Sequence, residues 1–349
     1  MTLNDLKNSL KEARREALEK PQEKYYFVIP LKIKYNSINK RHFTLLDTKI
    51  KVCSYNYIRK NFNYEKLEVE AEYDKKIEES LKPSRTYFVI EGYAMDEYRA
   101  GHSAFGKFEL LRSIINFIDQ YWQLHYHFGE PEPLSLIYPP KVFFAFDSNR
   151  TYLNKWMTDI TYDSREIDFN SYNLKSSKVI ERSEKLIKKI NSLKKEGLRD
   201  RIIGAFYLHN NALDYYDKKW LSFLSFWQIF ELIALSSEYN LKQDEVCKRM
   251  LSLLNEKDPY EDVFNVFKNK RNKFVHEGEL GDFTENDINM IEGFAQLAIQ
   301  FLIYEASNLK DTNGLNFFYR NVHTSEKELK TRISVLKYIE KFENEQVEP

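Results

Sequence analysis

The residues best suited to chemistry in this chain are Arg271 and His276, which lie five positions apart near the end of an expected helix. A guanidinium can hold a phosphate group through two parallel hydrogen bonds. An imidazole can transfer a proton near neutral pH, because the unperturbed pKa of histidine is about 6.5. Together the two groups could cleave RNA without a metal ion, although a pattern this short also arises by chance.

Basic residues surround this pair in the sequence. Lys268, Lys270 and Lys273 lie within three positions of Arg271. The whole chain is not a polycation, because its 53 lysines and arginines are balanced by 53 aspartates and glutamates. Any contact with nucleic acid must therefore come from a local basic patch, and it should weaken as salt is added.

The helix that carries the pair has recognisable ends. Asp258 and Pro259 predict its start, with the aspartate as N-cap and the proline at the first helical position. Gly278 predicts its end. Residues five apart on a regular α-helix point about 140° apart. We therefore expect His276 to lie in the last turn, where it can approach Arg271.

Glu231 interrupts an apolar helical stripe that includes Trp220, Leu224 and Trp227. A buried carboxylate is costly unless it is paired. Arg271 is the expected partner, and Glu231 would then orient the guanidinium. The alternative is that Glu231 caps or pairs locally and serves the structure alone.

The two halves of the chain differ in pattern. Seven of the nine prolines lie in the first 140 residues, which leaves the second half free to be helical. We expect an α+β domain over residues 1–172 and an all-α domain over 176–349. Strands are predicted at 25–34, 43–53, 66–73, 86–93 and 142–146, with one helix at 96–122. Later helices are predicted at 176–193, 198–214, 218–235, 243–255, from 258 onward, and at 284–307.

Other classes of protein are disfavoured. Cys53 and Cys247 lie far apart, which argues against a disulfide framework and a cysteine zinc cluster. The pair His125 and His127 lacks a third ligand at convincing spacing, so we expect no metal and no cofactor. We also expect no signal peptide and no membrane span, and therefore a cytoplasmic protein.

The segment Trp227 to Leu232, followed about 40 residues later by Lys270 to Gly278, resembles the HEPN superfamily, and most closely the group with ApeA-like HEPN domains. The resemblance covers roughly residues 198–310. It implies an all-α helical bundle of HEPN type and a metal-independent endoribonuclease that acts as a homodimer. In such a dimer, two helix ends meet across a two-fold axis and form one cleft.

The resemblance also implies roles for individual residues. His276 would act as general base or acid, and Arg271 would stabilise the charge on the phosphate. Asn272 would bind the phosphate or hold the histidine. The lysines at 268, 270 and 273 would follow the RNA backbone.

The biological context is likewise implied by the resemblance alone. Many relatives are triggered effectors in phage defence or toxin-like systems, and residues 1–172 would then sense a signal or bind a protein partner. Some relatives do not cleave. A non-catalytic module that binds nucleic acid, a nucleotide or a protein partner is therefore the alternative function.

Overall fold

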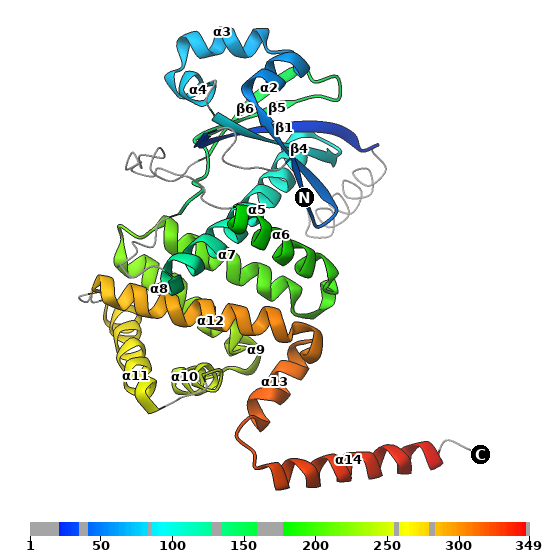
Figure 1. Ribbon diagram of the computed structural model, residues 1–349, viewed down its shortest axis with the longest axis vertical. Coiled ribbons are helices and arrows are strands. Elements are labelled where there is room, and N and C mark those ends of the chain that lie inside the picture. The colour runs from blue at the N-terminus through cyan, green and yellow to red at the C-terminus, as the bar shows by residue number, and fades with distance from the viewer. Residues whose placement is uncertain are drawn as a thin grey trace, which may run out of the picture. The chain divides into compact units, whose positions relative to one another are not determined.

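The computed structural model describes residues 21–34, 41–82, 85–126, 135–158, 177–254, 258–278 and 283–346. An N-terminal antiparallel sheet is followed by a helical C-terminal part, so the predicted order of α+β and all-α folds is confirmed (Figure 1). The chain divides into two compact units. Unit 1 comprises residues 1–192 and 209–217, and unit 2 comprises residues 193–208 and 218–349. This division differs from the expected break at residues 172–176.

Unit 1 is built on a six-stranded sheet in the order β2-β3-β4-β1-β5-β6. All neighbouring strands pair antiparallel. The strands are β1 (Glu23–Lys34), β2 (His42–Leu45), β3 (Thr48–Ser54), β4 (Arg85–Ala94), β5 (Val142–Phe146) and β6 (Tyr152–Met157). Four of the five strand predictions are thus confirmed. The segment at 43–53 is split into a hairpin, because Leu46 and Asp47 adopt positive φ angles of 46° and 65°.

Helices cover both faces of this sheet (Figure 1). The long helix α5 (Glu97–Tyr126) packs on one face, where Phe105 stacks on Phe143 with ring centroids 5.3 Å apart. The short helices α2 (Tyr55–Asn61), α3 (Glu65–Tyr73) and α4 (Lys75–Ser80) supply Ile58, Leu67 and Ile77 to the core on the other face. The helix α6 (Ser177–Ser192) also belongs to unit 1.

The predicted strand at 66–73 is wrong, because this segment forms helix α3. Its charged and apolar residues alternate as in a strand, but only Leu67 is buried, while Val69 and Tyr73 are exposed. Lysine, glutamate, alanine and leucine favour a helix, and acidic residues in the first turn stabilise its N-terminus. Strand β6 was not predicted, since as an edge strand it has mostly exposed or half-buried side chains.

A buried polar network joins α5 to the last residues of α7 (Asp200–Asp214), both within unit 1. Arg112 is 1% exposed and donates to Asp214 at 2.7 Å and to Glu109 at 2.7 Å. Asn116 donates to Asn210 at 2.6 Å. Burial disfavours the charged form of Arg112, but the two carboxylates outweigh it and raise the pKa of the guanidinium. The cost of burying the Arg112 charge is therefore offset by its two carboxylate partners.

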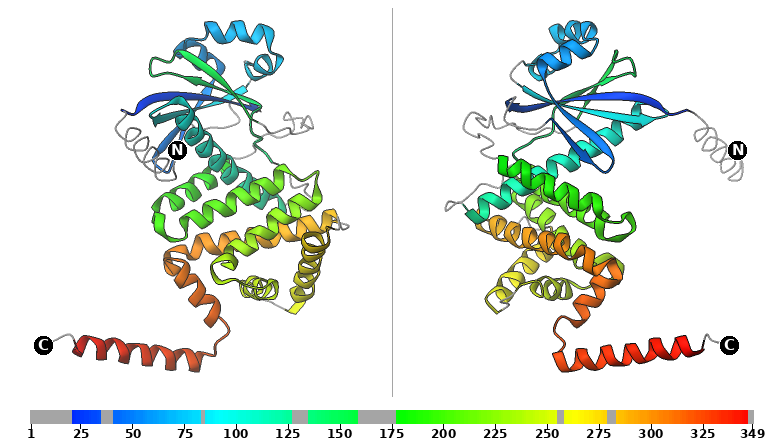
Figure 2. Two further views of the ribbon diagram at one scale, coloured as in Figure 1. Left: turned by 180° about the vertical axis from the view of Figure 1, so that it is seen from behind. Right: turned by 45° about the vertical axis from the view of Figure 1, so that its right-hand side comes forward.

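Unit 2 is a helical bundle centred on α8 (Lys219–Ile233). Besides residues 193–208 and α8, it contains α9 (Ser236–Tyr239), α10 (Gln243–Leu251), α11 (Asp258–Asn272), the wide turn η2 (Lys273–Glu277), α12 (Glu285–Leu309), α13 (Thr312–Asn321) and α14 (Glu326–Gln346). Phe223, Phe226, Trp227 and Phe230 of α8 are at most 1% exposed. Helix α12 lies alongside α8 (Figure 2). Its predicted start is confirmed by a capping box between Thr284 and Asp287.

The C-terminal end of α8 is held by side chains from three other elements. Its carbonyls at Leu232–Ala234 accept hydrogen bonds from Arg201, Tyr319 and Arg249 in turn. The last carbonyls of a helix lack the usual partner one turn later, so these donors satisfy acceptors that the helix itself leaves free or only weakly bonded. The end of α8, where Glu231 lies, is therefore firmly placed within unit 2.

The two cysteines and the apolar helices complete the description of the fold. Cys53 and Cys247 are both free and buried, and burial raises their pKa to about 12 and about 11. No helix in the described segments combines the length and apolar character required to cross a membrane.

Glu292 of α12 should make unit 2 less stable as the pH rises. It is 2% exposed and accepts a hydrogen bond from Gln296 at 3.0 Å, and burial raises its pKa from 4.5 to about 8. The folded state therefore binds the proton of Glu292 more tightly than the unfolded state does. The stabilisation that this proton gives to the folded state is complete below pH 4.5 and is lost between pH 4.5 and about 8. We expect Glu292→Gln to remove this loss and to raise the free energy of unfolding at pH 8 by on the order of a few kcal/mol.

Urea unfolding of both proteins at several pH values measures this effect. Glu326→Gln is the matched control, because the Glu326 side chain is 81% exposed. Identical pH dependence of the wild type and Glu292→Gln would contradict the prediction.

Candidate functional site

The predicted site residues lie at the C-terminal end of α11 in unit 2. One side of α11 is held in the core by Phe264 and Phe267, each 1% exposed. The helix starts at Asp258, within one residue of the predicted position. The expected capping role of Asp258 lies outside the side chains that the structure describes.

The expected pair of Arg271 and Glu231 is present. Arg271 Nη2 donates to Glu231 Oε1 at 3.1 Å, and the two side chains are 17% and 26% exposed. The same oxygen accepts a hydrogen bond from Gln243 Nε2 at 2.9 Å and from Trp227 Nε1 at 3.1 Å. A carboxylate with three donors is well compensated in a half-buried position. The Glu231 carboxylate thus fixes the orientation of the Arg271 guanidinium.

Gln243, the first residue of α10, was not identified from the sequence. Besides donating to Glu231, its Oε1 accepts a hydrogen bond from Trp227 Nε1 at 3.1 Å. Each of the three side chains of Trp227, Glu231 and Gln243 is therefore hydrogen-bonded to the other two. A single glutamine at the start of a helix carries no periodic signal, so only the packing of α10 beside α8 reveals its role.

The end of α11 widens into the π-type turn η2 and stops at Gly278, which has a φ angle of 68°. The predicted helix end is thus confirmed. A π-type turn bonds residues five apart rather than four, so it rotates less per residue than an α-helix. From Arg271 to His276 the rotation about the helix axis is therefore smaller than in a regular α-helix.

Aromatic stacking anchors this turn to the start of α8. Phe274 stacks on Trp220 with ring centroids 5.0 Å apart and an interplanar angle of 28°. His276, two residues later, is exposed. Among the described residues, no direct contact joins His276 to Arg271. The arrangement presents an imidazole to solvent on the turn that follows the helix end carrying Arg271.

The three lysines expected at the site have different environments. Lys268 Nζ is 2.6 Å from Asp244 Oδ1, and Lys270 Nζ is 2.6 Å from Asp287 Oδ2. Lys273 is exposed and makes no ion pair within the described part of the chain. Of these lysines, only Lys273 is thus immediately available to an incoming anion. Asn272 lies beside Arg271, whose Nη1 is 3.4 Å from Asn272 Oδ1.

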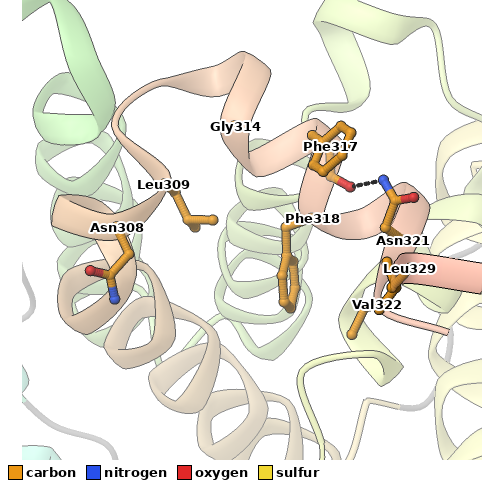
Figure 3. Close-up of a pocket in the computed structure, with 8 residues that line it drawn as sticks. All are labelled: Asn308, Leu309, Gly314, Phe317, Phe318, Asn321, Val322 and Leu329. Carbon is orange, nitrogen blue, oxygen red and sulfur yellow. Dashed lines mark hydrogen bonds between the residues drawn. The ribbon is translucent and has the colours of Figure 1, made fainter. Parts of the chain in front are cut away.

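The described part of the chain contains a cavity but no cluster of metal-ligating side chains. Among the described residues, no three histidine, cysteine, aspartate or glutamate side chains gather closely enough to hold a metal ion. A cavity of about 480 Å³ lies at the junction of α12, α13 and α14, lined by residues that include Leu309, Phe317, Phe318 and Leu329 (Figure 3). No titratable side chain lines it, so it offers no acid or base.

Comparison of the chain with protein-family models, curated proteins and solved structures finds no match. The resemblance to the HEPN superfamily therefore rests on the sequence around Glu231 and Arg271–Gly278.

The contacts of Glu231 predict its effect on stability. Glu231→Gln removes the charge that compensates Arg271 and weakens three hydrogen bonds at one oxygen. We expect the free energy of unfolding to fall by about 1.5–3 kcal/mol, the range for hydrogen bonds to a charged group. Glu277→Gln, at an exposed position of the same helix end, is the matched control for denaturant unfolding. Equal stability of the two variants would show that the Glu231 contacts do not stabilise the fold.

Proposed function

We propose that the chain is a metal-independent endoribonuclease of HEPN type that acts as a homodimer in the cytoplasm. One observation carries the proposal: Glu231 holds the Arg271 guanidinium while His276 is exposed on the turn that follows. An arginine has five N–H donors, so the bonds of Arg271 to Glu231 and Asn272 leave others for a phosphate. In this proposal, unit 1 senses a signal or binds a partner and thereby triggers cleavage.

The proposed reaction proceeds by attack within the RNA. The ribose 2′-hydroxyl gives its proton to His276 of one copy, and its oxygen bonds to the adjacent phosphorus. The bond from phosphorus to the 5′-oxygen breaks, and that oxygen takes a proton from His276 of the other copy. Arg271 stabilises the charge on the non-bridging oxygens. The products are a 2′,3′-cyclic phosphate and a free 5′-hydroxyl.

The electrostatics of the site support a modest and salt-sensitive affinity for RNA. In the proposed complex, Lys273 contacts the phosphate backbone directly, and Asn272 binds the phosphate or holds the histidine. Lys268 and Lys270 contribute only when a phosphate replaces the carboxylates that they contact.

The second candidate function is non-catalytic binding of RNA, a nucleotide or a protein partner. The oriented Arg271 guanidinium and the exposed Lys273 favour it, because they can hold a phosphate without any proton transfer by His276. Binding without any cleaved product distinguishes this function from the first.

Removing the imidazole tests the proposed chemistry. We expect His276→Ala to lower RNA cleavage in the presence of EDTA by at least about a hundredfold, the usual contribution of a general acid or base. Gel analysis of labelled RNA measures the loss. His323→Ala, at an exposed position between α13 and α14, is the matched control and should cleave like the wild type. Equal cleavage by His276→Ala and the wild type would overturn the proposed role.

The composite site predicts that activity depends on protein concentration. We expect cleavage per molecule to decrease when the wild-type protein is diluted, because dissociated copies contain only half of the site. Sedimentation velocity at the same concentrations measures the fraction of dimer. Undiminished cleavage per molecule in a fully monomeric sample would rule out the homodimeric mechanism.

A further inference from the structure

Two consecutive residues at the start of α10 touch the candidate site. Gln243 donates to Glu231 at 2.9 Å, and Asp244 accepts from Lys268 at 2.6 Å. Lys268 also donates to Asn265 on its own helix at 3.2 Å. The first turn of α10 therefore contacts both the carboxylate that orients Arg271 and one of the lysines expected to bind RNA.

The pair of Lys268 and Asp244 is open to solvent on the side of the carboxylate. The side chain of Asp244 is 69% exposed, whereas that of Lys268 is 19% exposed. An ion pair this exposed is weak in water, so another anion can replace the carboxylate. An RNA phosphate offers Lys268 the same kind of oxygen acceptor that Asp244 provides.

The neighbouring pair of Lys270 and Asp287 is different. Asp287 is 13% exposed, and it also accepts hydrogen bonds from the backbone N–H of Thr284 at 2.8 Å and from its hydroxyl at 2.7 Å. The bond from the Thr284 backbone, together with the bond from the Asp287 backbone N–H to Thr284 Oγ1, forms the capping box at the start of α12. A phosphate that displaced Asp287 from Lys270 would compete with a carboxylate fixed by the fold. Of the two pairs, the one at Asp244 is therefore the exchangeable one.

We infer that Asp244 competes with RNA phosphate for Lys268 and thereby limits the affinity of the site for RNA. The inference rests on the proposed function. The competitor is charged at all physiological pH values, as an ordinary aspartate is, and the hydrogen bond from Lys268 holds the pKa of Asp244 lower still. Lys248 and Lys242 lower it further. The Asp244 carboxylate thus occupies the position at Lys268 Nζ that an RNA phosphate would take.

The test is an RNA-binding titration in a His276→Ala background, so that bound RNA stays intact. The probe is a fluorescein-labelled single-stranded RNA of mixed sequence, followed by fluorescence anisotropy at several salt concentrations. We expect Asp244→Asn to bind roughly twofold to fivefold more tightly, which corresponds to the strength of an exposed ion pair. The salt dependence should steepen by up to about 0.7 in the slope of log K against log salt, the value for one further phosphate contact on single-stranded RNA.

Glu245→Gln is the matched control. It removes the same charge from the same helical turn, but the carboxylate of Glu245 lies 3.7 Å from Arg249 rather than at Lys268. Equal tightening by both variants would show a general effect of charge and would overturn the inference.

A double-mutant cycle with Lys268→Met separates the remaining outcomes. We expect Lys268→Met to change affinity little when Asp244 is present and to cancel the gain when Asp244 is replaced by asparagine. A gain that persists without Lys268 overturns the inference and leaves the proposed function standing. Absence of RNA binding by every variant overturns both.

Discussion

The structure around the candidate site depends on one ion pair, between Glu231 on α8 and Arg271 on α11. Glu231 is the only carboxylate within α8, a helix that buries seven of its fifteen residues. Such a group is tolerated only with compensation, and Trp227, Gln243 and Arg271 provide it at a single oxygen. These contacts join the end of α8, the start of α10 and the end of α11, and they hold the Arg271 guanidinium in place.

The precision of this arrangement comes from α8 as a whole. Its aromatic residues are buried beside α11 and α12, and its last carbonyls are satisfied by Arg201, Tyr319 and Arg249. Its first turn holds the wide turn after α11 through the stack of Trp220 on Phe274. A rigid helix therefore supports both the arginine and the turn after it, whereas His276 itself is exposed. Functional groups held by a packed element are placed more accurately than groups on free loops.

The charges near the site are compensated locally rather than gathered in an open basic patch. Arg271, Lys268 and Lys270 each contact a carboxylate, and the chain as a whole has equal numbers of acidic and basic residues. Binding of an RNA phosphate would therefore be an exchange of anionic partners, in which the exposure of each carboxylate determines how readily it is replaced. The affinity for RNA would then depend on the exposure of Asp244 and Asp287 as much as on the number of lysines.

The sequence by itself determined the features that depend on neighbouring residues. It placed the sheet ahead of the helices, the start of α12 at Thr284 and the end of η2 at Gly278, because caps and periodicity act within a few positions. It also indicated the pair of Glu231 and Arg271, since a carboxylate in an apolar stripe requires a partner.

Only the tertiary structure decided where Gln243 lies and which aspartates contact Lys268 and Lys270. These outcomes depend on contacts between helices far apart in the sequence, and spacing along the chain carries no information about such contacts.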